Sequence, residues 1–275
     1  MRKNTSFSIV TEIDSDVEKF IRQSKDGEMG ILALRDNILF PGTVTPITIG
    51  RKKSLKALKK AEKNGSLIAA FAQKSHETDD PSMDDLYHVG TVCRIVHMMK
   101  LPDGNHNALL QATNRVGLDS LEETSDGLYG KVTAIPEIKE EDKEAELTVT
   151  IQMLQERMKL LSTLSDNIPV EMVELLKKMP AGIFYVNFIG TNYPLTTEKK
   201  AQLIFEDTDL GRATLLLKFI NFEIQLAQMR KEVETKTHID LDRQQREYFV
   251  NQEIRNLQAE LGNTDEFSNK FDDIN

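Results

Sequence analysis

The chain has 275 residues, which is enough for one large domain or two ordinary domains, each with its own core. Apolar residues make up 39% and charged residues 29%, so the composition is that of a globular protein and excludes a disordered chain. The formal net charge of −9 disfavours nucleic acid and anionic membrane surfaces as partners, because the summed field repels phosphate groups.

The cysteine content and the N-terminus bear on the compartment. The single cysteine, Cys93, excludes an internal disulfide framework and fits a reducing compartment. No apolar region of signal-peptide type and no apolar run of about 18 residues is present. We therefore expect a cytoplasmic protein without membrane contact, in which Cys93 is a buried structural thiol.

The first part of the chain is predicted to be β-rich. Residues 1–28 are polar and predict a loose N-terminal extension. Short β-type runs separated by turn formers then predict a compact, mostly antiparallel β domain over 29–138. The segment "KLPDGNHN", between Met99 and Ala108, predicts a hairpin loop. One helix, capped by Ser54 and closed at Asn64-Gly65, interrupts the strands.

A charge-dense stretch, "PEIKEEDKEAE" (136–146), then separates this domain from a helical region. Its carboxylates could form an acid/base pair or a metal site, but without an apolar frame a solvated linker is the better interpretation. The period of the apolar residues changes to that of a helix after it, and residues 139–208 predict a bundle of four helices. The first carries an apolar stripe, the second opens at Pro169, the third ("AGIFYVNFIG") should be buried, and the fourth is capped by Thr196 or Thr197.

The last predicted element is a long helix over 209–262, followed by an acidic tail at 263–275. Its second half is polar on most of its surface, and no further helices remain to cover it. A narrow apolar stripe with +4, +3, +4 spacing follows this half, and we expect it to pack against the same helix of another copy through Val250, Ile254, Leu257 and Leu261.

Motifs for catalysis are missing from the sequence. It contains no phosphate-binding loop, no dinucleotide fingerprint, no H-E-x-x-H and no G-x-S-x-G. The five histidines are scattered. We therefore predict no catalytic, cofactor-binding or metal-binding residues in this chain. A cryptic hydrolase with scattered catalytic residues is the alternative, and turnover of casein by the chain itself would reveal it.

Apolar residues occupy two predicted turns, where polar residues are expected. Phe40 and Pro41 lie at a strand junction, and Met99, Leu101 and Pro102 lie at the hairpin tip. Methionine and proline at loop tips are adaptable contact residues, so we predict that these five residues bind protein substrates. The alternative is that the loops pack against the core of their own domain.

Three motifs in order resemble the N-terminal region of the Lon family of proteases. They are "ILALRDNILFPGTVTPITIGR", "MMKLPDGNHNALLQATNRV" and "DRQQREYFVNQEIRNLQAELG", which together span most of the chain. Ala33 stands where the family usually has proline, and Gln111-Ala112-Thr113 replaces a turn that often contains glycine.

The resemblance implies an α+β architecture, with a PUA-like Lon N-domain followed by a helical bundle and a long arm helix. It further implies a homo-hexameric, ATP-dependent serine protease whose ATPase domain, with ATP and Mg, and whose Ser–Lys protease domain lie beyond this chain. The expected role of this part is recognition of unfolded or degron-bearing proteins and positioning on the ring. A stand-alone binding or adaptor module is the alternative, although the arm helix argues against it.

Overall fold

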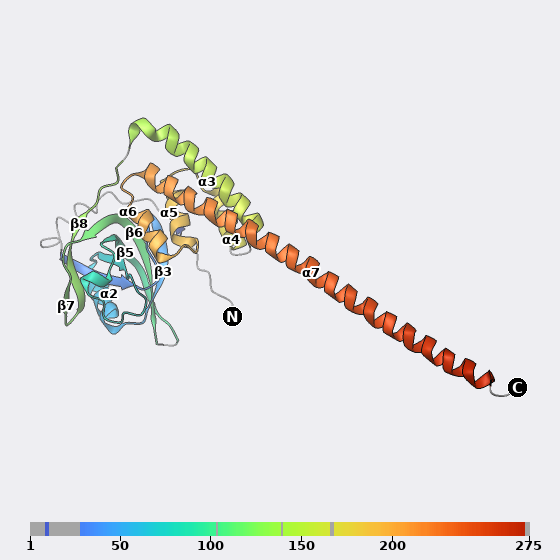
Figure 1. Cartoon of the computed structure of the whole chain (residues 1–275). Coiled ribbons are helices and arrows are strands. Elements are labelled where there is room, and N and C mark those ends of the chain that lie inside the picture. The colour runs from blue at the N-terminus through green and yellow to red at the C-terminus, as the bar shows by residue number, and fades with distance from the viewer. Residues whose placement is uncertain (1–8, 11–27, 103, 139, 166–167, 273–275) are drawn as a thin grey trace. The chain divides into compact units, whose positions relative to one another are not determined.

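The structure is a computed structural model that describes residues 9–10, 28–102, 104–138, 140–165 and 168–272 (Figure 1). The predicted extension at 1–28 therefore lies largely outside the described residues. The chain forms two compact units, 1–222 and 223–275. Its elements are β1 (Ile9–Val10), β2 (Glu28–Leu34), β3 (Thr43–Ile49), α2 (Lys52–Asn64), β4 (Ile68–Ala72), η2 (Met83–Asp85), β5 (Val89–Lys100), β6 (His106–Leu118), β7 (Glu122–Thr124), β8 (Gly127–Ala134), η3 (Glu141–Lys143), α3 (Glu144–Leu164), α4 (Val170–Lys178), α5 (Ile183–Asn192), α6 (Thr197–Phe205) and α7 (Asp209–Asp272).

The strands of the first unit form one sheet in the order β1-β3-β6-β5-β4-β2-β8-β7. A further pairing of β6 with β8 closes β6, β5, β4, β2 and β8 into a barrel. Among the described strands only β2 and β4 pair in parallel. The predicted α+β class with a mostly antiparallel β part is confirmed.

Strand alternation divides the core of the β part into two clusters. Met29, Ile31 and Ala33 of β2 belong to one cluster, and Leu32 and Leu34 belong to the other. Successive side chains of a strand point to opposite faces, so β2 is buried on both of its faces. A strand of this kind is an almost continuous apolar run, as "MGILAL" is in the sequence.

Helix α2 covers one of these clusters through Leu58 and Ala61. It begins at Lys52 and its N-cap is Arg51, so the prediction that Ser54 caps it is wrong. The C-terminal end agrees with the sequence: Gly65 adopts the left-handed conformation, with φ of 63°, and donates to the carbonyl of Glu62.

Helices α3 to α6 follow the β part in the same unit. The predicted stripe of α3 is buried at Ile151, Leu154, Met158 and Leu161, and each such side chain contributes about 1.5–3 kcal/mol of hydrophobic stabilisation. Helix α5 buries residues 185–191, as expected from its apolar sequence. Pro169 precedes α4, and the Thr196 hydroxyl accepts a hydrogen bond from the Lys199 amide at the start of α6.

Helix α7 is continuous from Asp209 to Asp272. Residues 263–272, predicted as an acidic tail, are therefore helical, and Gly262 does not end the helix. In the second unit the side chains described between 228 and 258 are all exposed. In the described part of the chain, no helix combines the length and the apolarity needed to span a lipid bilayer.

Candidate functional site

The β5–β6 hairpin carries the predicted contact residues Met99, Leu101 and Pro102. Its turn is closed by two backbone hydrogen bonds, from Leu101 N to Asn105 O (2.8 Å) and from Gly104 N to Leu101 O (3.0 Å). Met99 is 50% exposed, Pro102 is exposed and Leu101 is half-buried. The hairpin therefore presents apolar side chains to solvent at its tip.

A β-bulge sets the direction of these side chains. The β5–β6 register shifts between Ile95 and His97, so Val96 is the extra residue of β5 and is 51% exposed. Beyond the bulge Met98 packs against the core, while Met99 faces solvent. We name Val96, Met99, Leu101 and Pro102 the hairpin tip. Val96 was not among the predicted residues, because the sequence does not reveal the bulge.

Phe40 and Pro41 do not belong to an exposed surface. Phe40 is 1% exposed, and its ring lies 3.1 Å from the position that a Cβ atom would take on Gly190 of α5. Pro41 is buried, and its carbonyl accepts a hydrogen bond from Asn187 Nδ2 (3.0 Å). The prediction that these two residues contact substrate is wrong, because their turn packs against α5 of the same unit.

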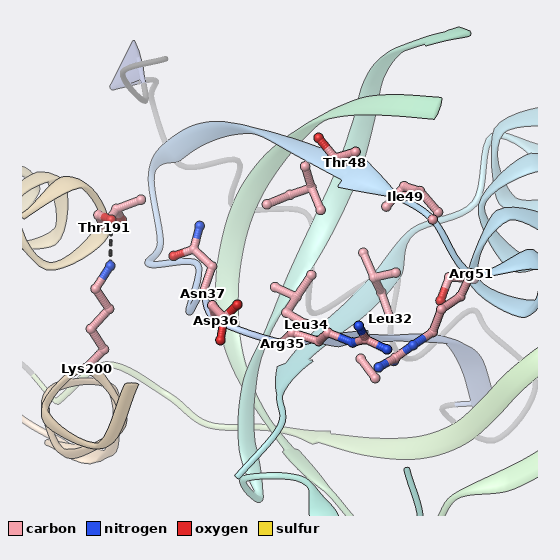
Figure 2. A pocket seen from close by; sticks show the side chains of 14 residues that line it. Leu32, Leu34, Arg35, Asp36, Asn37, Thr48, Ile49, Arg51, Thr191 and Lys200 are labelled. Atoms are coloured by element: carbon pink, nitrogen blue, oxygen red, sulfur yellow. Dashed lines mark hydrogen bonds between the residues drawn. The ribbon is translucent and has the colours of Figure 1, made fainter. Parts of the chain in front are cut away.

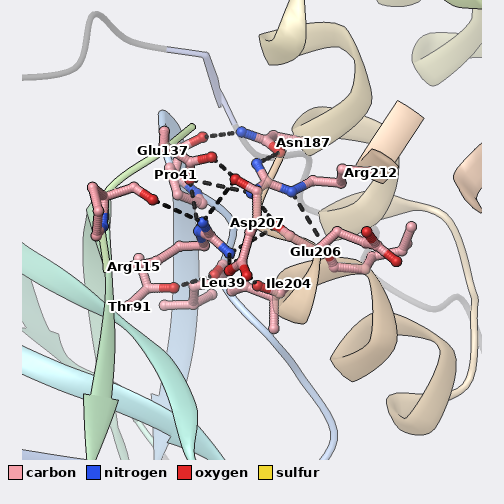
Figure 3. A network of polar contacts seen from close by, with 12 residues as sticks. Leu39, Pro41, Thr91, Arg115, Glu137, Asn187, Ile204, Glu206, Asp207 and Arg212 are labelled. Atoms are coloured by element: carbon pink, nitrogen blue, oxygen red, sulfur yellow. Dashed lines mark hydrogen bonds and ion pairs between the residues drawn. The ribbon is translucent and has the colours of Figure 1, made fainter. Parts of the chain in front are cut away.

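Two buried arginines form a polar network between the β part and the helices (Figure 3). Arg115 of β6 is fully buried and donates from Nε to Glu137 (2.8 Å) and from Nη1 to the carbonyls of Ile204 (3.0 Å) and Glu206 (2.7 Å). Arg212 of α7, 1% exposed, donates from Nη2 to both oxygens of Glu137 (3.2 and 2.8 Å). The carboxylate of Glu137 thus bridges a strand and a helix.

This geometry corrects the interpretation of 136–146 as a solvated linker. Glu137, the second residue of that stretch, is only 26% exposed on its side chain and is held by both guanidinium groups. Burial lowers the pKa of Arg212, and the neighbouring Glu137 opposes that shift. The sequence signal was an arginine in the middle of an apolar strand, in "ATNRVGL", which requires a buried partner.

A cavity of about 700 Å³ opens between the ends of β2 and β3 (Figure 2). Its apolar side is formed by Leu32, Leu34 and Ile49, which also belong to the core. Lys200 of α6, 6% exposed, lines the cavity and donates from Nζ to the carbonyl of Thr191 (2.9 Å). Loss of solvation lowers the pKa of Lys200 to about 8.

Two observations on the described residues concern metal-binding groups and the single thiol. They contain no group of three or more His, Cys, Asp or Glu side chains that could hold a metal ion. Cys93 is buried, as predicted, and burial raises the pKa of its thiol, which disfavours the reactive thiolate.

The residues expected to pack between arms lie on α7 in the second unit. Val250, Ile254 and Leu257 are each about half exposed, so the predicted stripe is accessible to solvent at these three positions. The side chain of Leu261 lies outside the described residues. An exposed Arg243–Glu247 ion pair (3.1 Å) flanks the stripe.

Comparison with known proteins identifies relatives over most of the chain. The family model for the substrate-binding domain of ATP-dependent protease La (LON) matches residues 28–221. Lon proteases from Flavobacterium johnsoniae and Parabacteroides distasonis are 32% and 35% identical to the chain over 90% and 92% of its length. The chain spans about 30% of the length of these two relatives.

The fold has a solved counterpart. The N-terminal domain of the Mycobacterium avium complex Lon protease matches 70% of this chain and 98% of its own, with a TM-score of 0.56 and 17% identity. The likeness to this solved structure supports the fold, and the match to the family model supports membership of the family. The chain belongs to the family of substrate-binding domains of ATP-dependent protease La (LON).

Proposed function

We propose that the chain recognises unfolded or degron-bearing proteins through the hairpin tip, without carrying out chemistry itself. The observation that supports this most directly is the exposure of Met99 and Val96 on a hairpin whose other face packs against the core. Unfolded chains display the apolar segments that native proteins bury, and methionine adapts to many partner shapes.

The whole protein in this proposal is an ATP-dependent serine protease. Its ATPase domain, using ATP and Mg, and its Ser–Lys protease domain act on what this chain has bound. Six copies in a homo-hexameric ring would raise the effective affinity of individually weak sites. The free, buried thiol of Cys93 fits a reducing compartment, and we propose a cytoplasmic location.

Helix α7 has a separate role in this account. The part of α7 in the second unit carries the exposed stripe of Val250, Ile254 and Leu257, which fits an apolar contact with the same stripe of another copy. We propose that this arm contact positions the substrate-binding domains of neighbouring subunits.

The test is the affinity of the chain for a permanently unfolded model protein with reduced and alkylated cysteines. The variants are Met99→Glu and Leu101→Glu, and Met153→Glu is the matched control, because Met153 is exposed on α3 away from the hairpin. Placing a charge in an apolar contact should weaken binding by about tenfold, or about 1.4 kcal/mol.

Circular dichroism and thermal unfolding establish that each variant is folded. The proposal fails if Met99→Glu and Leu101→Glu bind the unfolded protein as tightly as Met153→Glu does.

A further inference from the structure

The amine of Lys200 is a buried cation with one protein partner among the described residues. An ammonium group has three donors, and one of them reaches the carbonyl of Thr191 in the last turn of α5. The Thr191 carbonyl lies near the C-terminal, negative end of the α5 dipole, which favours the positive charge of Lys200 at that place. Two donors and the net charge remain without an acceptor in the described part of the chain.

A second buried polar atom at the same cavity also lacks a partner. Oδ1 of Asn37 is inaccessible to solvent and accepts no hydrogen bond from the described residues. Figure 2 shows Asn37 and Lys200 among the side chains that line the cavity, with the Lys200 amine directed at Thr191. Because this oxygen is closed off from solvent, a ligand in the cavity cannot contact it, and the unused donors of the Lys200 ammonium are the groups that a ligand can satisfy.

The charges around the cavity indicate the sign of that ligand. Arg35, Arg51 and Lys200 line it together with the carboxylate of Asp36, and Asp79 next to the lining forms an ion pair with Arg35. This local excess of positive charge lies in a protein whose net charge is −9. Figure 2 places the two arginines together, apart from Lys200, and Arg51 is held by the side chain of Gln73. The lysine end is therefore the one with unused donors.

The size and lining of the cavity suit a short peptide segment. A volume of about 700 Å³ lies within the range of ligand pockets, which is about 300–1,000 Å³. Leu32, Leu34 and Ile49 offer apolar contact beside the charged end. A C-terminal residue presents a carboxylate beside its own apolar side chain, which matches the ammonium of Lys200 and the apolar side chains next to it.

We propose that this cavity is a second binding site, for a carboxylate at the end of a protein segment, which forms an ion pair with Lys200. The identity of the carboxylate as part of a protein substrate rests on the proposed function. The site itself rests only on the geometry of the cavity.

The test uses one short apolar peptide, labelled with a fluorophore at its N-terminus, in three forms: the free acid, the C-terminal amide, and the amide with glutamate at its last position. Fluorescence anisotropy gives the affinity of the full chain for each form. Because hydrogen bonds to charged groups are worth about 1.5–3 kcal/mol, the free acid should bind the wild type at least about tenfold more tightly than the amide.

Lys200→Met keeps the length of the side chain and should remove the difference between acid and amide. Lys131→Met is the matched control, because Lys131 is an exposed lysine on β8, and it should keep the difference. Asn37→Asp, which adds a carboxylate to the cavity lining, should also weaken the preference for the acid, even if Lys200→Met were to fold poorly. Recovery of affinity by the glutamate form would assign the natural ligand to acidic side chains, and no recovery would assign it to C-termini.

Equal binding of acid and amide by the wild type overturns the proposal, and so does a preference for the acid that survives in Lys200→Met. The peptide test is independent of the test of the hairpin tip, because Met99→Glu should retain the preference for the acid. Either proposed site can therefore be refuted without refuting the other.

Discussion

Removal of the Glu137 carboxylate should destabilise the first unit more than removal of any other single charge that is partly exposed in residues 136–146. In Glu137→Ala the guanidinium groups of Arg115 and Arg212, 0% and 1% exposed on their side chains, lose their shared counter-ion. Loss of one partner from a buried ion pair costs about 3–5 kcal/mol. Glu137 is 26% exposed, and Arg115 keeps its bonds to backbone carbonyls, so we expect a value near the lower limit, about 3 kcal/mol.

Urea unfolding followed by circular dichroism at 222 nm measures this loss. Glu141→Ala is the matched control, since Glu141 is an exposed carboxylate in the same segment, and it should change the free energy of unfolding by less than about 0.5 kcal/mol. The reasoning also predicts partial recovery in the double variant Glu137→Ala/Arg212→Met, which removes one of the orphaned charges. Equal effects of Glu137→Ala and Glu141→Ala would refute it.

Three further predictions concern Lys200, Phe40 and α7. Lys200→Met should be more stable than the wild type by about 2 kcal/mol at pH 7. The pKa of Lys200 falls from 10.5 to about 8 on folding, which costs the folded wild type about 3 kcal/mol. Loss of the hydrogen bond to Thr191 in the variant offsets about 1 kcal/mol of this gain. The unfolded state holds this proton more tightly, so the destabilisation of the wild type by Lys200 is complete below pH 8 and disappears toward pH 10.5. Thermal unfolding of both proteins across this range measures the stability difference, and a difference that does not change with pH would contradict the prediction. Phe40→Ala should lower the free energy of unfolding by about 3–5 kcal/mol in urea titrations and leave binding of unfolded protein unchanged, whereas a loss below about 1 kcal/mol would contradict its buried position. Ile254→Glu should reduce any self-association seen by sedimentation equilibrium, and a wild type that stays monomeric at about 100 μM would exclude a strong arm contact.

Local patterns in the sequence predicted the local elements. The spacing of Ile151, Leu154, Met158 and Leu161 predicted the buried face of α3, since one face of a helix repeats every 3.6 residues. The Pro-Asp-Gly turn predicted the β5–β6 hairpin, and Gly65 predicted the end of α2. These features depend on residues that are neighbours along the chain.

The errors and omissions involve partners far apart in the chain. Arg115 bonds to Ile204 across 89 residues and Arg212 to Glu137 across 75, so neither pattern nor propensity reveals the network. Phe40 has the sequence context of an exposed turn, and only its packing against Gly190 shows that it is buried. Lys200 stands beside Lys199 in "TEKKAQLIF", and a single helical step of about 100° separates this buried lysine from a half-buried one.

Methyl NMR of methionine in the intact chain, followed during titration with an unfolded model protein, reports directly on substrate binding at the hairpin tip. The chain has 10 methionines, of which Met99 lies at the hairpin tip and Met98 packs against the core beside it. Substrate binding at the hairpin tip should shift or broaden the Met99 methyl signal first, with little change at Met98 or at the buried Met172. Changes at the exposed Met153 or Met229 with none at Met99 would show that the substrate binds elsewhere and would contradict the account.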